Sequence, residues 1–419
     1  MYKKEILDNG ITVVTESIPH VRSVSLGIWV NVGSRDEREG EDGISHFVEH
    51  MLFKGTTSRS AKDIASEIDS IGGELNAFTS REITTYYVKV LDEYLPKAID
   101  ILSDIFYNSA FDPEEIEKEK QVVIEEIKTV EDSPEDYVHD LHAQNILKGN
   151  PLGKPILGNL KVIKSLTREK IIDFIERNYY PQNIVISVAG NLKFDSLIDS
   201  LSELFGKRSE KDYKNIAIKE DISSEIKGDI VLKKRKLEQT HICCGTKGLP
   251  IAHKDRYGIY ILNSLLGGSV SSRLFQEVRE KRGLAYSIYS YLSSYRDIGI
   301  FNIYAATGLS TGIEVINLIK KEFNNLRENG INQKELQTAI NYLKGHLMLS
   351  MESTGSRMSR LAKDEIYQRR FFSLDEIMND VEIVSMNQIE GLINELLKDD
   401  FFTLTTLGAI SKEEISLID

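Results

Sequence analysis

Two histidines and a glutamate close together in the sequence could bind a metal ion and do chemistry with it. The stretch Gly43–Gly55 reads GISHFVEHMLFKG and contains His46, Glu49 and His50. A helix turns about 100° per residue, so His46 and His50 would lie one turn apart, with Glu49 beside them. Two neutral imidazoles can hold a zinc ion, and a carboxylate can take a proton from a zinc-bound water. The alternative is an ordinary pair of solvated or hydrogen-bonded histidines, because short patterns recur by chance.

A third protein ligand is needed for such a zinc site, and the segment Pro113–Asp132 offers one. Its pattern predicts a helix with an apolar stripe formed by Ile116, Val122, Val123, Ile127 and Val130. Glu119 and Glu126 fall within this stripe, whereas Glu125 lies on the polar side. A carboxylate on an apolar face is costly unless it is paired or bound to a cation. We therefore expect Glu126 to be the third ligand and Glu119 to orient a ligand or a water. Alternatively, both lie at a partly hydrated edge of the stripe.

The H-x-x-E-H pattern followed by Glu126 resembles the metal site of the M16 metallopeptidases, the family of pitrilysin and the mitochondrial processing peptidase. The likeness extends to GSRDE at Gly33–Glu37 and GGELNAFTSREITTYY at Gly72–Tyr87, and it covers essentially the whole chain. Size and layout are most similar to the β subunit of the processing peptidase and its short bacterial relatives. The resemblance implies one Zn²⁺ per chain, bound by both histidines and Glu126, with Glu49 as general base.

Composition limits the class of protein. The chain has 419 residues, of which 41% are hydrophobic, and its 65 acidic against 52 basic side chains give a net charge of −13. These values predict a globular protein of two or more domains that does not bind nucleic acid. Cys243 and Cys244 are adjacent in a predicted strand and would point to opposite faces, which argues against a mutual disulfide. With no leader and no long apolar run, we expect a soluble cytoplasmic protein without membrane contact.

The chain is expected to consist of two similar α+β halves. The predicted parts are an N-terminal zinc-binding domain, a polar linker and a C-terminal domain without metal that contributes substrate-binding residues: residues 1–206, 207–228 and 229–419. Two stretches of the second half repeat the pattern of the first: 274–308 repeats 68–90, and 386–410 repeats 166–192. We expect each half to be an antiparallel β-sheet with helices packed on one side, the two halves enclosing a cleft.

The second half contains no His/Glu pair at metal spacing, so its contribution must be different. Arg279 and Tyr286 span a predicted helix end at Gly283 and the start of a strand. The resemblance implies that this pair holds the substrate backbone and stabilises the oxyanion. Without it, the two residues are typical of a surface arginine on a charged helix and a half-buried tyrosine on a strand.

Two further segments are candidates for binding substrate. The first resembles the family's substrate-binding edge strand, to which a peptide would add as an extra strand: Glu74, Asn76, Ala77 and Phe78. An interior strand would show the same alternation. Asp136 and Asp140 would lie on one face of a predicted helix, where the resemblance suggests that they hold a substrate arginine or lysine. Alternatively, both are solvated helix surface, as we also expect for His139 and His142.

These expectations describe a zinc endopeptidase that cleaves unfolded peptides or short polypeptides, with a preference near basic residues. The resemblance implies a peptide substrate and a homodimer as partners. Two alternatives stay open. One is a catalytic subunit that is inactive until it meets a separate partner subunit with a glycine-rich loop. The other is a non-catalytic scaffold of the same fold, and the intact metal motif argues against it.

Overall fold

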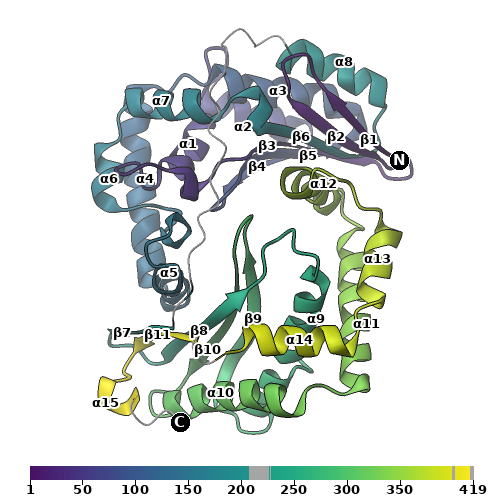
Figure 1. Ribbon diagram of the computed structural model, residues 1–419. Coiled ribbons are helices and arrows are strands. Elements are labelled where there is room, and N and C mark those ends of the chain that lie inside the picture. Colours follow the sequence, from purple (N-terminus) through teal and green to yellow (C-terminus); the bar gives the residue numbers. More distant parts are fainter. Residues whose placement is uncertain (207–225, 227, 399–401, 416–419) are drawn as a thin grey trace. The chain divides into compact units, whose positions relative to one another are not determined.

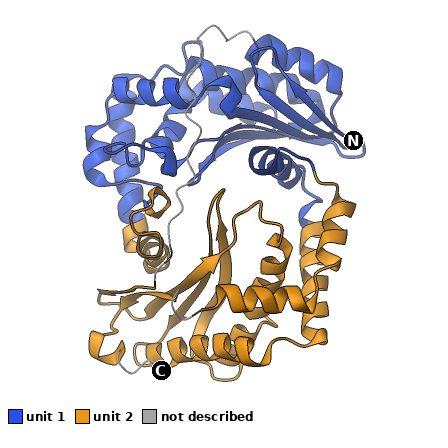
Figure 2. Ribbon diagram, viewed as in Figure 1, with its two compact units in different colours: residues 1–129, 154–219, 350–371 blue, residues 130–153, 220–349, 372–419 orange. Residues whose placement is uncertain are grey.

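The computed structural model describes residues 1–206, 226, 228–398 and 402–415, which form two compact units (Figures 1 and 2). Unit 1 is built from the described parts of residues 1–129, 154–219 and 350–371, and unit 2 from those of residues 130–153, 220–349 and 372–419. Each unit contains a β-sheet with packed helices, so the predicted α+β class with two related halves is confirmed. The predicted linker lies almost entirely outside the described residues.

The sheet of unit 1 has the strand order β1-β2-β6-β3-β5-β4, which leaves β4 at one edge. Its strands are β1 (Tyr2–Ile6), β2 (Thr12–Ser17), β3 (Ser23–Val30), β4 (Glu74–Thr79), β5 (Thr84–Leu91) and β6 (Ile184–Gly190). Neighbouring strands are antiparallel except β2 and β6, which are parallel. The sheet is therefore mixed, and not antiparallel throughout as expected, because β6 re-enters the sheet after a run of helices.

Helices cover one face of this sheet. They are α1 (Ile44–Leu52), α2 (Ala61–Ser70), α3 (Leu95–Asn108), α4 (Pro113–Asp132), α6 (Leu160–Ser165), α7 (Arg168–Asn178) and α8 (Phe194–Phe205). Alternating strand residues such as Val13, Leu26 and Val88 join these helices in one hydrophobic core. Within this core α1 packs against β4 and β5, which fixes the histidine helix near the edge of the sheet.

The described part of the unit 2 sheet repeats the order of strands β2 to β4 of unit 1. Its order is β7-β11-β8-β10-β9, from β7 (Ile230–Lys234), β8 (Thr240–Gly248), β9 (Ala285–Ser294), β10 (Gly299–Thr307) and β11 (Thr403–Gly408). Its helices are α9 (Arg256–Leu266), α10 (Gly312–Asn329), α11 (Gln333–Ser350), α13 (Leu374–Glu382), α14 (Met386–Leu396) and α15 (Lys412–Ile415). β7 and β11 are parallel, as β2 and β6 are, which matches the predicted repeat.

Cys243 and Cys244 lie next to each other in β8 and are both buried. Cys244 joins the hydrophobic core beneath the helices of unit 2, whereas Cys243 joins a separate cluster on the opposite face of the sheet. Both thiols are free. The prediction that strand alternation directs the two side chains to opposite faces of the sheet is confirmed.

Each sheet is also packed on its other face by a helix that is distant in sequence (Figure 2). α12 (Thr354–Gln368) contacts β2, β3 and β6 of unit 1, and α5 (Pro134–Ile146) contacts β8 and β11 of unit 2. Glycines leave room for both helices. A Cβ on Gly27 would lie 3.0 Å from Met358 Sδ, and one on Gly245 would lie 2.5 Å from His142 Nε2.

This exchange of helices differs from the predicted one-sided packing and from the predicted continuous domains, residues 1–206 and 229–419. Each half of the chain provides a helix to the sheet of the other half, so each compact unit is discontinuous in sequence. The physical reason is that both faces of these sheets are apolar. On the second face of the first sheet, α12 covers Val14, Trp29 and Val185.

From the sequence, His139 and His142 of α5 were expected on the solvated helix surface. In the structure both contact residues of the unit 2 sheet. His142 is 1% exposed, and its Nδ1 lies 3.1 Å from the Thr405 hydroxyl. Burial lowers the pKa of His142 to about 3, so it is neutral. His139 Nδ1 lies 2.7 Å from the Tyr291 hydroxyl, and His139 Nε2 lies 3.1 Å from the Tyr289 hydroxyl. The prediction was wrong because the covering strands are far away in sequence.

Candidate metal centre

The short helix α1 is fixed at its N-terminus by a buried carboxylate. The helix begins after Gly43, which has a φ of 94° and could not take a Cβ, since that atom would lie 2.6 Å from the Leu157 carbonyl oxygen. The backbone N–H groups of Gly43 and Ser45 donate to Glu37 at 2.8 and 2.9 Å. Glu37, from the GSRDE segment, thereby satisfies N–H groups that the helix itself leaves unpaired.

His46, His50 and Glu126 come together as a group able to hold a metal ion. The Nε2 atoms of the two histidines are 3.1 Å apart. Glu126 Oε2 lies 3.7 Å from His46 Nε2 and 3.6 Å from His50 Nε2. In the part of the chain that the structure describes, this is the group of three donors that meets the geometry of a metal site. Two imidazole nitrogens and one carboxylate oxygen are a donor set that suits zinc and leaves a further position open.

The structure distinguishes Glu126 from its neighbour on α4. Glu125 is exposed and its carboxylate lies 2.7 Å from Lys128 Nζ, whereas Glu126 faces the histidines. The stripe around Glu126 is less buried than expected, since Val122 is 50% exposed and the Glu126 side chain is 41% exposed. The helical period therefore distinguished the carboxylate that faces the histidines, although it did not show where the buried face of α4 ends.

Glu119, the second predicted carboxylate of α4, is hydrogen-bonded to His50. Its side chain is almost fully buried, and its oxygens lie 2.7 Å from His50 Nδ1 and 2.6 Å from Lys54 Nζ. Burial raises the pKa of Glu119, but the hydrogen bonds from His50 and Lys54 outweigh it and hold that pKa below its ordinary value. With Nδ1 donating to Glu119, the His50 Nε2 lone pair is left to face His46 and Glu126.

The two imidazoles differ in their electrostatic surroundings. Burial, together with the neighbouring His50, lowers the pKa of His46 to about 3, so His46 is neutral and able to act as a ligand. Burial also lowers the pKa of His50, but Glu119, Glu126 and Glu49 outweigh it and raise that pKa above the ordinary value. A cation in the centre would compete with the proton for His50 Nε2.

Glu49 lies beside the histidine pair and is held by a strand residue. Its carboxylate accepts a hydrogen bond from the Thr79 hydroxyl at the end of β4. Burial raises the pKa of Glu49 above its ordinary value, against the Thr79 hydrogen bond and the His50 charge, which lower it. A carboxylate that is partly desolvated, and so more basic than usual, suits proton transfer near neutral pH.

The remaining predicted site residues lie on β4 and in unit 2. On β4, Ala77 is half-buried, while Glu74, Asn76 and Phe78 are exposed on the other face of the edge strand. In unit 2, the Arg279 guanidinium lies over the rings of Phe275 and Tyr286 at 4.7 and 4.8 Å, and Tyr286 is 79% exposed. The candidates of α5 differ in exposure: Asp136 is exposed and Asp140 half-buried.

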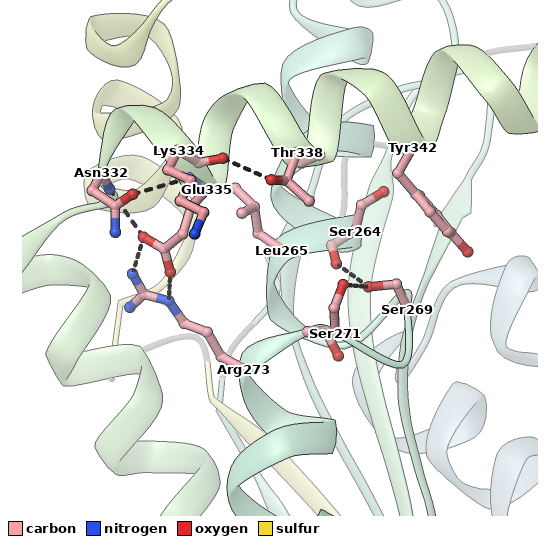
Figure 3. A pocket seen from close by; sticks show the side chains of 12 residues that line it. Ser264, Leu265, Ser269, Ser271, Arg273, Asn332, Lys334, Glu335, Thr338 and Tyr342 are labelled. Carbon is pink, nitrogen blue, oxygen red and sulfur yellow. Dashed lines mark hydrogen bonds and ion pairs between the residues drawn. The ribbon is translucent and has the colours of Figure 1, made fainter.

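Unit 2 also contains a polar pocket of about 220 Å³ between the end of α9 and the start of α11 (Figure 3). Its charges are largely matched within the wall: Arg273 Nε lies 2.9 Å from the Glu335 carboxylate, and Asn332 caps the N-terminus of α11 through the Glu335 N–H. The Tyr342 hydroxyl donates to the Gly268 carbonyl at 3.1 Å. This pocket contains none of the predicted site residues.

Comparison with known proteins places these observations in a family. The family model described as insulinase (peptidase family M16) matches residues 12–160, and the model described as peptidase M16 inactive domain matches residues 165–343. A Bacillus subtilis protein named uncharacterized zinc protease YmxG is 44% identical over 401 residues, covering 96% of this chain and 97% of the relative. The chain belongs to peptidase family M16. An uncharacterized zinc protease of Streptomyces coelicolor is 38% identical over 94% of this chain and 87% of the relative.

Solved structures support the same M16 fold. A Pseudomonas fluorescens structure titled peptidase M16 inactive domain superposes with a TM-score of 0.91 at 19% identity, covering 98% of both chains. A protease from Helicobacter pylori gives a TM-score of 0.89 at 23% identity, covering 97% of this chain and 99% of the other. Within the described part of this M16 chain, no helix combines the length and hydropathy needed to span a bilayer.

Sequence reasoning missed three residues that contact α1 or the carboxylates of the candidate centre: Glu37, Lys54 and Thr79. All three lie in segments that carried the resemblance, but their roles depend on contacts between separate elements. Periodicity within one helix or strand cannot reveal such contacts. The available signal was their proximity to the histidine motif or to the strand that packs on it.

Proposed function

We propose that this protein is a zinc-dependent endopeptidase that cleaves unfolded peptides or short polypeptides. The observation that carries the proposal is the group of His46, His50 and Glu126 with Glu49 beside it. The names of the M16 relatives as zinc proteases support the same assignment. We further propose one zinc ion per chain, since the three donors form one group on α1 and α4.

The chain's own residues would divide the work of hydrolysis between binding and proton transfer. Zinc held by His46, His50 and Glu126 would supply a Lewis acid that polarises a carbonyl and activates water. Glu49, within the same helix, would take the proton from the attacking water and pass it to the leaving amine. Glu119 would keep His50 in the tautomer that presents Nε2.

The edge strand β4 supports an extended peptide as substrate. It has β5 on one side and ends the sheet on the other, so its outer edge can pair with a peptide main chain. The exposed residues Glu74, Asn76 and Phe78 would contact the peptide's side chains, and Ala77 would contribute its backbone. A substrate that must enter as a strand would have to be unfolded at the cleavage site.

We propose that Arg279 and Tyr286 hold the peptide and stabilise its oxyanion, and that Asp136 and Asp140 favour a basic residue before the scissile bond. The resemblance to the family supports these roles. The stacking of Arg279 over Tyr286 supports their acting together, because the two side chains are already in contact. Replacing Tyr286 by Phe should lower kcat about 10-fold with the zinc content unchanged.

The decisive experiment is cleavage of a peptide library by the purified protein alone, with the cut sites mapped. We expect cleavage that stops on chelation, returns with zinc, and falls ~10²-fold or more in Glu49→Gln while that variant keeps its zinc. Equal zinc loss in Glu49→Gln and His46→Ala would contradict the base assignment. Cut sites in the parent and in Asp136→Ala/Asp140→Ala would then test the basic preference.

A second candidate function is that of a catalytic subunit which requires a partner subunit. The resemblance to a subunit of the processing peptidase supports this alternative, and the second half of this M16 chain matches a family model whose description is an inactive domain. Zinc binding without peptide cleavage by the protein alone would favour it. We propose a homodimer in solution, which sedimentation of the purified protein would test.

A further inference from the structure

We propose that Thr79 is a positioning residue for Glu49. Its hydroxyl would hold one oxygen of the Glu49 carboxylate, so that the other oxygen is directed to the water and the leaving amine. This inference rests on the proposed function, in which Glu49 is the general base, and it adds a residue to that site. Nothing in the H-x-x-E-H pattern itself points to Thr79, which lies 30 residues away at the end of another element.

The position of Thr79 on β4 fixes the direction of its hydroxyl. Leu75, Ala77 and Thr79 are the half-buried residues of the strand, whereas the residues between them are exposed. Leu75 and Ala77 pack against the hydrophobic core that contains α1, so Thr79 faces the same side. A β-branched side chain on a strand has few allowed rotamers. The hydroxyl is therefore a stiff donor, and it donates to Glu49 Oε2.

The backbone around Thr79 is anchored immediately beyond the strand. Thr79 pairs with Thr84 of β5, and the turn between them is closed by the Ser80 N–H, which donates to the Ile83 carbonyl at 2.8 Å. In the same turn, Glu82 forms a fully buried ion pair with Arg35 at 2.5 Å. A buried pair of this kind holds its two segments in one arrangement.

The same short segment holds both partners of the Glu49–Thr79 hydrogen bond. Residues 33–37 bind the β4–β5 turn through Arg35 and through the Ser34 N–H, which donates to the Ser80 carbonyl at 3.2 Å. Two residues later, Glu37 caps the N-terminus of α1. Residues 33–37 therefore contact both the N-terminus of α1 and the turn that follows β4. A carboxylate held in this way loses little freedom when the reaction begins, which is the condition for efficient proton transfer.

The arrangement predicts an effect on catalysis rather than on binding. The outer edge of β4 is available to a peptide, while Thr79 points from the same strand to the base. Removal of the hydroxyl would leave the strand edge intact and release the carboxylate. Misplacement of a catalytic group by about 1 Å can lower the rate by ~10²-fold, so a freed Glu49 should lower kcat with little change in KM.

The test compares Thr79→Val with Thr79→Ser, using a peptide that the parent protein cleaves. Valine keeps the shape and the β-branch but has no hydroxyl, whereas serine keeps the hydroxyl. We expect Thr79→Val to lower kcat about 10-fold or more, with KM within about 2-fold and with unchanged zinc content and unfolding temperature. Thr79→Ser should recover kcat to within about 3-fold of the parent.

Three results would overturn the inference: parent-like kcat in Thr79→Val, equal losses in the valine and serine variants, or a loss of zinc in Thr79→Val. Should valine impair folding, Thr79→Ala against Thr79→Ser gives the same contrast. The parent and Glu49→Gln separate this inference from the proposed function. Parent activity that Glu49→Gln abolishes and Thr79→Val spares would refute only the role of Thr79, whereas an inactive parent would refute the peptidase proposal itself.

Discussion

At the scale of single residues, the side chains of the candidate metal centre are held by hydrogen bonds and ion pairs to their neighbours. His50 is oriented by Glu119, and Glu119 in turn is fixed by Lys54. Glu49 is held by Thr79. Loss of such supporting contacts typically lowers metal affinity or activity by ~10–100-fold. A variant that leaves the three donors intact can therefore still lose function.

Adjacent glutamates of α4 provide a test of ligand identity. Glu126→Gln should lose zinc affinity, because an amide replaces a charged oxygen that faces both histidines. Glu125→Gln is the matched control, since Glu125 is exposed and pairs with Lys128. Zinc titration of the metal-free proteins measures both. Similar affinities in the two variants would mean that Glu126 is not a ligand.

The residues of the centre could be predicted from sequence to the extent that their relation is local. His46, Glu49 and His50 share one helix, so their spacing alone brings them together. Glu126 was chosen from the helical period of a second helix, and it does lie near both histidines, although Val122 was wrongly assigned to the buried face. Thr79 could not be found in this way, because its contact joins a strand to a helix.

At the scale of elements, glycines in central strands allow the exchanged helices to pack closely. Gly245→Ala should destabilise the protein by about 1–3 kcal/mol, because its Cβ would meet His142 Nε2 at 2.5 Å and Ile146 Cδ1 at 2.7 Å. Gly345→Ala is the control: no atom lies within 4 Å of its Cβ, and alanine favours the helix α11. Denaturant unfolding of both variants measures the difference. An unchanged midpoint for Gly245→Ala would show that α5 can move away at no cost.

The buried imidazole of α5 makes stability depend on pH. The pKa of His142 is about 3 in the folded chain against an ordinary value near 6.5. Between these values the unfolded chain binds the proton first, so stability falls as pH decreases from about 6.5, by up to ~1.4 kcal/mol per unit. Above that range His142 contributes no pH dependence. Urea unfolding at pH 5 and pH 7 should show a smaller difference in His142→Gln than in the parent, and an equal difference would contradict this account.

Element boundaries followed from the sequence where a local signal marks them. The predicted helix at Pro113–Asp132 coincides with α4, since a proline stands at its start. The surroundings of an element could not be predicted as well. α5 was recognised as a helix, but its histidines contact strand residues that lie 152 and 263 residues further along the chain.

At the scale of the whole molecule, the two sequence halves do not coincide with the two compact units. Unit 1 needs residues 350–371, which include α12, and unit 2 needs residues 130–153, which include α5. The polar stretch at 207–228 suggested a simple boundary because composition reports where a chain is hydrophilic. It does not report which distant helix covers which sheet.

A fragment of residues 1–206 should therefore fold poorly. It contains the first sheet but lacks α12, so apolar side chains such as Trp29 and Val185 would be exposed. We expect a broad or early thermal transition and aggregation. The same fragment joined by a flexible linker to residues 350–371 should unfold cooperatively at a higher temperature. If both fragments unfold at the same temperature, α12 is dispensable for unit 1.

The exchanged helix α12 also has a consequence for how the protein is made. β6, the last strand of the first sheet, ends at Gly190, but α12 is complete only at Gln368, so the ribosome must add 368 − 190 = 178 residues in between. At about 5–20 residues per second, this interval lasts on the order of 10–40 s. Throughout that interval one face of the first sheet has no cover. A nascent chain in this state is a natural client for a ribosome-associated chaperone, and ribosome pauses after β6 should increase its misfolding.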